Sequence, residues 1–157
     1  MTDPTPRWLD MDQQRHWRHY LTGSALLLEA LTRQLEQEAG LSFSEYEVLV
    51  RLSEAEDRTL RMSELADSVV NSRSRLTHTV RRLESRGIVR RETCAEDGRG
   101  VNCVLTDEGF ALLAAAAPGH VAAVREHLVD RLSAEQFAAL GDAMATAFPE
   151  VAALAPR

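Results

Sequence analysis

The sequence predicts a mainly α-helical fold that carries a winged helix-turn-helix, and three observations support this. Residues 72–87 have apolar side chains at helical spacing on one side and arginines on the others. Residues 62–69 have the pattern of a short helix, and only two residues separate them from residue 72, as in a helix-turn-helix. Residues 88–94 and 101–105 have the pattern of strands around a loop with Asp-Gly and Arg-Gly pairs, so a β-hairpin, the wing, should follow the second helix.

The second helix of this motif should pack by one side against a core. Leu76, Val80 and Leu83 recur at i, i+4 and i+7, which puts them on one stripe. Ser72 can cap the first turn, and Gly87 can take the left-handed conformation that ends a helix. The arginine-bearing faces would then lie in solvent.

These other faces carry hydroxyls and arginines that suit a nucleic acid. Short hydroxyls and arginines near the start of such a helix can reach base edges in a DNA major groove, and arginines further along can reach phosphates. An arginine at the tip of the hairpin would reach a minor groove or the flanking backbone. The predicted DNA contacts are therefore Ser72, Arg73, Ser74, Arg75, Thr77, His78, Arg81, Arg82 and Arg99. An arginine-rich face that is merely solvated is the alternative.

The charge distribution fits this interpretation although the chain is acidic overall. The formal net charge is −6, but residues 58–100 contain ten arginines against six acidic residues, a local charge of +4 that leaves −10 for the rest. Phosphates respond to local charge more than to the total, and an acidic remainder discourages non-specific coating of DNA.

Further helices should frame this region on both sides. The sequence patterns predict helices at residues 13–38, 42–53, 110–132 and 133–148, and a short third strand at residues 59–61. Capping boxes begin at Ser42 and Ser133, and Thr106 is a further N-cap. Pro118 should bend its helix without abolishing it.

The terminal helices have more apolar side chains than they can enclose by themselves. These side chains are Trp8, Leu9, Leu128, Leu132, Phe137, Leu140, Met144 and Phe148. They form either a core within the monomer or an interface with a second copy of the chain. We favour the interface, because helix-turn-helix proteins read palindromic DNA as twofold dimers whose half-sites lie roughly 34 Å apart.

Several short motifs together resemble the MarR family of bacterial transcriptional regulators. They occur in that family's order and spacing at residues 61–66, 72–77, 82–91, 97–99 and 105–109. One departure is Cys94, where the family often has an acidic residue. The resemblance covers the whole chain, so it implies a single domain over residues 1–157. Within it, residues 42–106 would be the winged helix-turn-helix, called here the winged region, and residues 8–39 and 107–153 would be dimerisation helices.

The resemblance also implies a mode of action. Members of this family are obligate homodimers, usually repressors, that bind a palindromic operator and are released by a small effector. The effector pocket would lie between the dimerisation helices and the winged region. Family effectors are often small aromatic or phenolic anions, which an arginine or histidine beside aromatic rings would suit. Candidate effector-binding residues are Trp8, His16, Trp17, Tyr20, Arg51 and His120. Trp17 and Tyr20 can equally be core residues.

The two cysteines, Cys94 and Cys103, fall in the two strands of the predicted hairpin, where they can lie opposite each other. A disulfide between them would distort the wing, so a redox-responsive regulator of the same fold is an alternative function. We expect a reduced pair instead, because cytosolic thiols are kept reduced.

The sequence lacks the motifs of several other classes of protein. It contains no Gly-rich phosphate loop and no nucleophile elbow, so we expect neither an enzyme nor a cofactor. His16 and His19 have a spacing that can chelate a metal on a helix, but no cysteine or acidic cluster adjoins them, and no metal site is expected. A winged helix used only as a protein-interaction module remains an alternative, although five arginines on one helix would be an odd surface for it. Because there is neither an apolar run of ~18 residues nor a signal-peptide pattern, we expect a cytoplasmic protein without a membrane span.

Overall fold

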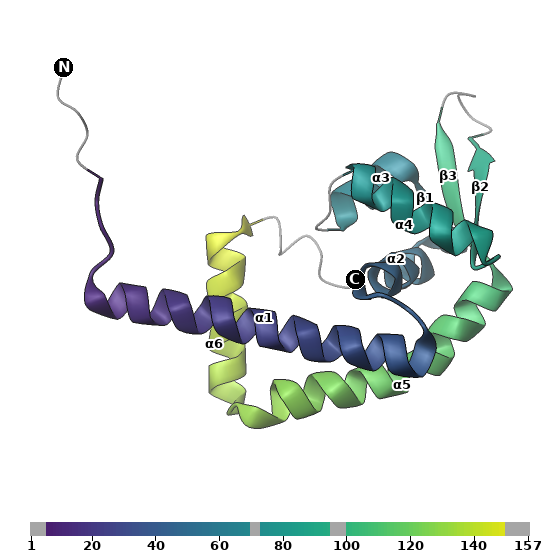
Figure 1. The fold of residues 1–157 in the computed structure, drawn as a ribbon. Helices are drawn as coiled ribbons and strands as arrows, with labels where there is room; N and C mark the ends of the chain where they lie inside the picture. Colours follow the sequence, from purple (N-terminus) through teal and green to yellow (C-terminus); the bar gives the residue numbers. More distant parts are fainter. Residues whose placement is uncertain (1–5, 70–72, 95–99, 150–157) are drawn as a thin grey trace, which may run out of the picture.

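The computed structural model describes residues 6–69, 73–94 and 100–149 (Figure 1). Its helices are α1 (Met11–Ala39), α2 (Phe43–Glu54), α3 (Met62–Ser68), α4 (Arg73–Ser85), α5 (Asp107–His127) and α6 (Ala134–Ala147). Its strands are β1 (Thr59–Arg61), β2 (Val89–Thr93) and β3 (Val101–Leu105), and the short 3-10 turns η1 (Glu56–Arg58) and η2 (Val129–Arg131) are also present. The predicted mainly α-helical winged helix-turn-helix fold is confirmed, with α3 and α4 as its two helices and β2 and β3 as its wing.

The strands form an antiparallel sheet in the order β1–β3–β2. β2 pairs with β3 along its whole length, beginning with Val89 opposite Leu105. β1, the predicted third strand, pairs with the other edge of β3 and places Leu60 opposite Cys103. The segment that leads into α3 is thereby tied to the base of the wing.

The core lies between the helices of the winged region and the sheet. Apolar side chains from α2, α3, α4, the sheet and the end of α1 form one buried cluster, to which α5 adds Leu113 and Ala116. Leu49 of α2, Leu65 of α3 and Leu83 of α4 are fully buried. Burying one leucine side chain contributes about 1.5–3 kcal/mol, so this cluster holds α3 and α4 in a fixed relation to α2 and the wing.

Two helices begin with the capping boxes that the sequence predicts. The Ser42 hydroxyl accepts from the N–H of Glu45, and the Glu45 carboxylate accepts from the N–H of Ser42. Ser133 and Gln136 make the same reciprocal pair at the start of α6. Each box satisfies two backbone donors that the first turn of a helix leaves without partners.

α1 begins two residues before the predicted start at Gln13, because a further capping box lies upstream. Asp10 accepts from the N–H of Gln13, and the Gln13 side chain accepts from the N–H of Asp10. At its other end α1 stops at Gly40, whose φ of 61° is in the left-handed region. Gly87 ends α4 with a φ of 71°, as predicted.

α5 begins where the N-cap pattern predicts, since the Thr106 hydroxyl accepts from a backbone N–H of the first turn. The helix continues through Pro118 and bends along its length (Figure 1). α5 is therefore bent but not interrupted, as the sequence predicts.

The predicted extension of this helix as far as residue 132 was wrong, because α5 ends at His127. Leu128 has non-helical backbone angles of φ −138° and ψ −64°. Arg131 Nε donates to the carbonyl oxygen of Glu126 at 2.7 Å, so a side chain satisfies one of the carbonyl groups that a helix end exposes. The chain can therefore turn into η2 before α6 begins.

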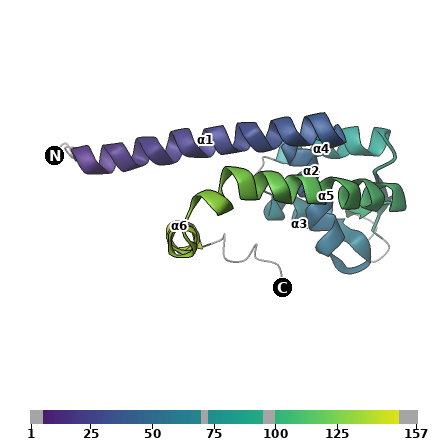
Figure 2. The same cartoon turned by 90° about the horizontal axis from the view of Figure 1, so that it is seen from below.

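The N-terminal half of α1 projects beyond the rest of the chain, and α5 runs beside its second half (Figures 1 and 2). Trp8 before α1, Trp17 on α1 and Phe137 on α6 are 81%, 50% and 41% exposed. These apolar side chains therefore do not form a core within one chain. Across the described ranges, no helix has the combination of length and apolar character that crossing a membrane requires.

Candidate nucleic-acid interface

α4 lies with its apolar stripe in the core and its arginine-bearing side in solvent. Leu76, Val80 and Leu83 are at most 2% exposed, as their spacing predicts. The predicted DNA contacts that lie exposed on α4 are Ser74, Arg75, His78, Arg81 and Arg82. Thr77 is half-buried. The helix therefore presents a polar, cationic face that the buried stripe holds outward.

Three of the predicted contacts cannot be placed in the same way. Ser72 and Arg99 lie outside the described residues. The side chain of Arg73 also lies outside them, although its backbone begins α4.

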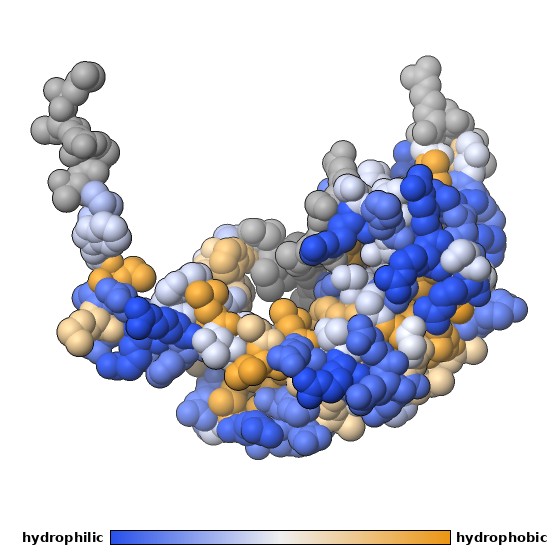
Figure 3. Space-filling model, viewed as in Figure 1, coloured by the Kyte–Doolittle hydropathy of each residue, from blue (hydrophilic) through white to orange (hydrophobic). Residues whose placement is uncertain are grey.

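The surface around α4 differs in character from the surface along α1. In Figure 3 hydrophilic residues gather over α3 and α4, whereas apolar residues reach the surface along α1. The polar surface thus coincides with the part of the chain where arginines outnumber acidic residues.

An ion pair fixes the wing against the end of α4. The Glu84 carboxylate accepts hydrogen bonds from the backbone N–H, Nε and Nη2 of Arg91 on β2, at 3.1, 3.0 and 2.6 Å. The side-chain hydrogen bond from Arg91 lowers the pKa of Glu84 and so favours its charged form. Sequence reasoning missed this pair, and its only signal was opposite charge on the two sides of the turn at Gly87.

Arg82, a predicted phosphate contact, also lies near an acidic side chain. Its Nη2 is 3.4 Å from Oε1 of Glu45 on α2. The sequence indicated only the capping role of Glu45, because nothing local in the sequence brings α2 beside α4.

The prediction that Cys94 can face Cys103 across the hairpin was wrong. The register places Cys103 opposite Arg91, while Cys94 follows the end of β2 and donates its N–H to the carbonyl oxygen of Gly100. Both cysteines are buried, and burial raises the pKa of Cys103 to about 12. A protonated, buried thiol is a poor nucleophile, so the wing does not supply the pair that the redox alternative requires.

Two of the candidate effector-binding residues share a pocket. Arg51 and His120 line a cavity of ≈ 270 Å³ between α2 and α5, together with Phe43, Tyr46, Glu47, Val50 and Glu54. The Tyr46 and His120 rings lie 4.4 Å apart between centroids. His120 Nδ1 is buried without a hydrogen-bond partner, and burial lowers the pKa of this imidazole. Sequence reasoning missed Tyr46 and Glu47, which only the packing of α2 against α5 brings to this cavity.

The other four candidates lie elsewhere on the chain. Tyr20 lines a separate groove of ≈ 590 Å³ between α1, η2 and α6. Its ring stacks on Trp17 with centroids 6.1 Å apart, and both rings are exposed, so the alternative that they are core residues is wrong. Trp8 and His16 are also exposed, near the free end of α1. One chain alone therefore does not bring the six residues together.

Comparison with known proteins agrees with this geometry. The model of the MarR family matches residues 41–101. One similar structure is the crystal structure of Sco3205, a MarR family transcriptional regulator from Streptomyces coelicolor, in complex with DNA. The two chains share 47% sequence identity and superpose with a TM-score of 0.88, over 92% of this chain and 91% of that one. The chain belongs to the MarR family.

Other MarR family members support the assignment. The crystal structure of AbsC, also from Streptomyces coelicolor, is 40% identical with a TM-score of 0.87 and covers 94% of this chain and 99% of that one. The transcriptional regulator PecS of Dickeya dadantii is 31% identical over 109 residues, which are 69% of this chain and 66% of PecS. These relatives are transcriptional regulators rather than enzymes, so the prediction that this MarR family chain is not an enzyme is confirmed.

Proposed function

We propose that this MarR family chain binds double-stranded DNA sequence-specifically and acts as a repressor. The observation that carries the proposal is α4, whose buried stripe turns an arginine-rich face to solvent. The similarity to Sco3205, whose structure contains DNA, supports it. Helices of this kind enter the major groove, where their first residues read base edges and their arginines contact phosphates.

We assign the contacts by position along α4 and the wing. Arg81 and Arg82, in the second half of α4, would contact the DNA backbone, and Arg99 would contact the minor groove or adjacent phosphates from the wing. Base edges and nearby phosphates would be contacted by Ser72, Arg73, Ser74, Arg75, Thr77 and His78.

We propose that the chain is a homodimer formed through residues 8–39 and 107–153. The exposed rings of Trp17 and Phe137 and the groove between α1, η2 and α6 are apolar surfaces that a second copy would cover. An isologous interface would hold two winged regions (42–106) about one helical turn of DNA apart, so the operator would be palindromic. A sedimentation mass of one chain at micromolar concentration would contradict this step.

We propose the cavity beside His120 as the effector site, for a small aromatic or phenolic anion. Arg51 supplies a cation, the Tyr46 and His120 rings supply apolar faces, and His120 Nδ1 lacks a partner that a ligand can provide. The other four candidates would contribute to this site only where a second copy brings its α1 alongside; they are Trp8, His16, Trp17 and Tyr20. Because the cavity lies between α2 and α5, a ligand there would shift the populations of DNA-binding and non-binding arrangements and release the operator.

The test is to select operators from a random duplex pool and then compare variants over a range of salt concentrations. Arg75→Ala should lose about ten-fold or more of the preference for the operator over random DNA. Arg99→Ala should weaken binding to all duplexes alike and reduce the slope of log affinity against log salt concentration by about one. Arg7→Ala removes the same charge from an exposed position before α1, outside residues 8–39, and should change neither quantity.

Two outcomes would overturn the proposal. Unchanged operator affinity in both Arg75→Ala and Arg99→Ala would remove α4 and the wing from the interface. If the chain retained no duplex even in dilute salt, the winged region would instead be a protein-interaction module, because a phosphate-neutralising protein binds DNA most tightly at low salt.

A further inference from the structure

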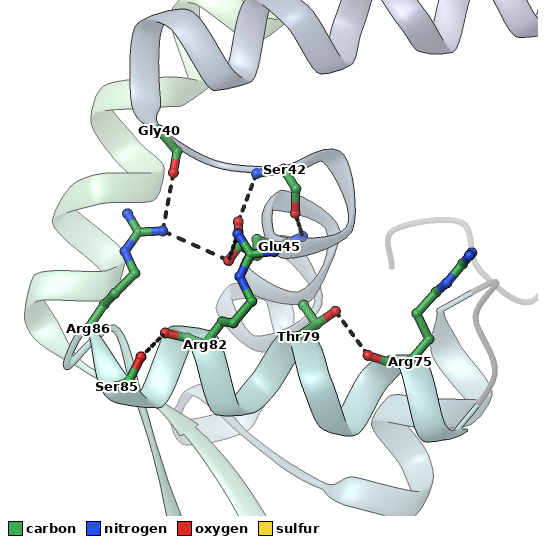
Figure 4. A network of polar contacts seen from close by, with 8 residues as sticks. All are labelled: Gly40, Ser42, Glu45, Arg75, Thr79, Arg82, Ser85 and Arg86. Carbon is green, nitrogen blue, oxygen red and sulfur yellow. Dashed lines mark hydrogen bonds and ion pairs between the residues drawn. The ribbon is translucent and has the colours of Figure 1, made fainter.

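A buried carboxylate lies beside the end of α4, between the start of α2 and the side chains of Arg82 and Arg86 (Figure 4). Glu45, in the first turn of α2, is 1% exposed. Its Oε2 accepts from the N–H of Ser42 at 2.8 Å. Its Oε1 is buried without a hydrogen bond, although two guanidinium groups lie within ion-pair distance. A charge in such a place is costly unless cations compensate it, so these two arginines matter to it.

The two cations come from the end of α4: Arg82 lies in its last turn, and Arg86 lies in the turn that follows it. Arg82 Nη2 and Arg86 Nη1 lie 3.4 and 3.9 Å from Oε1 of Glu45. Arg86 Nη1 also donates to the carbonyl oxygen of Gly40 at 3.2 Å, at the residue that ends α1. One carboxylate therefore joins the junction of α1 and α2 to the last turn of α4 and the turn that follows it.

The two arginines differ in what they offer to solvent. Arg86 is 38% exposed and has two partners in this junction, so it holds α4 in place. Arg82 is 69% exposed, and its ion pair with Glu45 lacks the geometry of a hydrogen bond. Its guanidinium can therefore donate to an anion in solvent while the carboxylate behind it keeps the side chain oriented.

We propose that Glu45 is a positioning residue for DNA binding, which acts by holding the Arg82 guanidinium at the surface of α4 where a DNA phosphate arrives. The inference rests on the proposed function. A long side chain that is oriented in advance loses less conformational freedom on binding, so the contact becomes stronger. Charge alone predicts the opposite change in DNA affinity. Glu45 repels phosphates, so neutralising it would tighten DNA binding if it had no positioning role.

The variant that separates these effects is Glu45→Gln. Glutamine also completes a capping box, so the bond to the N–H of Ser42 can be retained while the charge opposite Arg82 is removed. We expect the operator affinity of the full chain to fall about ten-fold, as when one charge-assisted contact is lost. The slope of log affinity against log salt should also fall by about one, because one phosphate contact is lost.

Two further variants test whether the effect runs through Arg82. Ser42→Ala removes the cap without removing either arginine, so it should lower the melting temperature and leave the salt slope unchanged. Arg82→Ala should reproduce the loss of slope, and the double variant with Glu45→Gln should bind no more weakly than Arg82→Ala alone. If Glu45→Gln does not give a native circular dichroism spectrum, Glu45→Asp provides the same test, because its shorter side chain withdraws the carboxylate from Arg82.

The outcomes that would overturn the inference are specific to it. Equal or tighter operator binding by a folded Glu45→Gln, with the slope unchanged, would show that Glu45 does not position Arg82. Fully additive losses in the double variant would show the same. A failure of the proposed function is distinguishable from either, because Arg75→Ala would then also leave operator preference unchanged.

Discussion

Gly109, in the first turn of α5, stands where α4, the wing and α5 meet, and replacing it with alanine should destabilise the protein. A Cβ at this position would lie 2.1 Å from the carbonyl oxygen of Ile88 and 2.7 Å from Cδ1 of Leu105. The Ile88 carbonyl oxygen cannot easily move away, because it accepts from the N–H and the hydroxyl of Thr106 at 3.2 and 2.9 Å. Ordinary contacts of a Cβ begin near 3.4 Å, so the backbone itself must shift.

The magnitude follows from three contributions. Overpacking of this kind costs about 1–3 kcal/mol. Losing a hydrogen bond between Thr106 and Ile88 adds about 1 kcal/mol. Alanine recovers about 1 kcal/mol relative to glycine inside a helix. The free energy of unfolding of Gly109→Ala should therefore fall by about 1–3 kcal/mol, the range of a single overpacking defect.

The assay is urea unfolding at one fixed protomer concentration, since association changes apparent stability. The matched control is Gly141→Ala on α6, where an added Cβ meets nothing within 4 Å. This control should be as stable as the unmodified chain or gain up to about 1 kcal/mol. If Gly109→Ala were also as stable as the unmodified chain, the close approach of α5 to the base of the wing would not constrain the fold.

Three further predictions address the pocket, the cysteines and the dimer. Burial lowers the pKa of His120 below the ordinary 6.5, so the unfolded chain takes up this proton at a higher pH than the folded chain does, and the free energy of unfolding should fall as pH drops below about 6.5. Between pH 7 and pH 5, urea unfolding should show a smaller loss of stability for His120→Phe than for the unmodified chain. An equal loss in both would contradict the assignment. Cys103, with its pKa raised to about 12, should react with iodoacetamide only as fast as the chain unfolds, and diamide should leave DNA binding unchanged; a Cys94–Cys103 disulfide in the native protein would be the opposite result. Leu140→Glu places a charge in the groove between α1 and α6 and should shift the sedimentation mass from two chains to one with little change in circular dichroism, whereas a persistent dimer would remove this groove from the interface.

The sequence predicted those features that depend on neighbouring residues. The buried stripe of α4 follows from helical periodicity, and the starts of α2 and α6 follow from capping boxes whose members are three residues apart. The left-handed Gly87 and the wing that follows it are local in the same sense. Each of these features is decided within one or two turns of chain, where residue type and spacing carry most of the free-energy difference.

The features that sequence reasoning missed depend on packing between distant segments. Tyr46 meets His120 only because α2 packs against α5, and Glu45 meets Arg82 only because α2 lies behind α4. The offset of Cys94 from Cys103 follows from strand register, which a shift of one residue would change. The early end of α5 depends on a side chain from the next turn, so helical periodicity alone extends the helix too far.

The central claim is that the exposed face of α4 meets DNA, and photo-crosslinking tests it most directly. A photoreactive amino acid would replace His78, which is exposed on α4, and in a second variant Glu135, which is exposed at the start of α6. Irradiation of each variant with its selected operator should give a covalent DNA adduct from position 78 and none from position 135. An intact complex that crosslinks from position 135 and not from position 78 would contradict the claim.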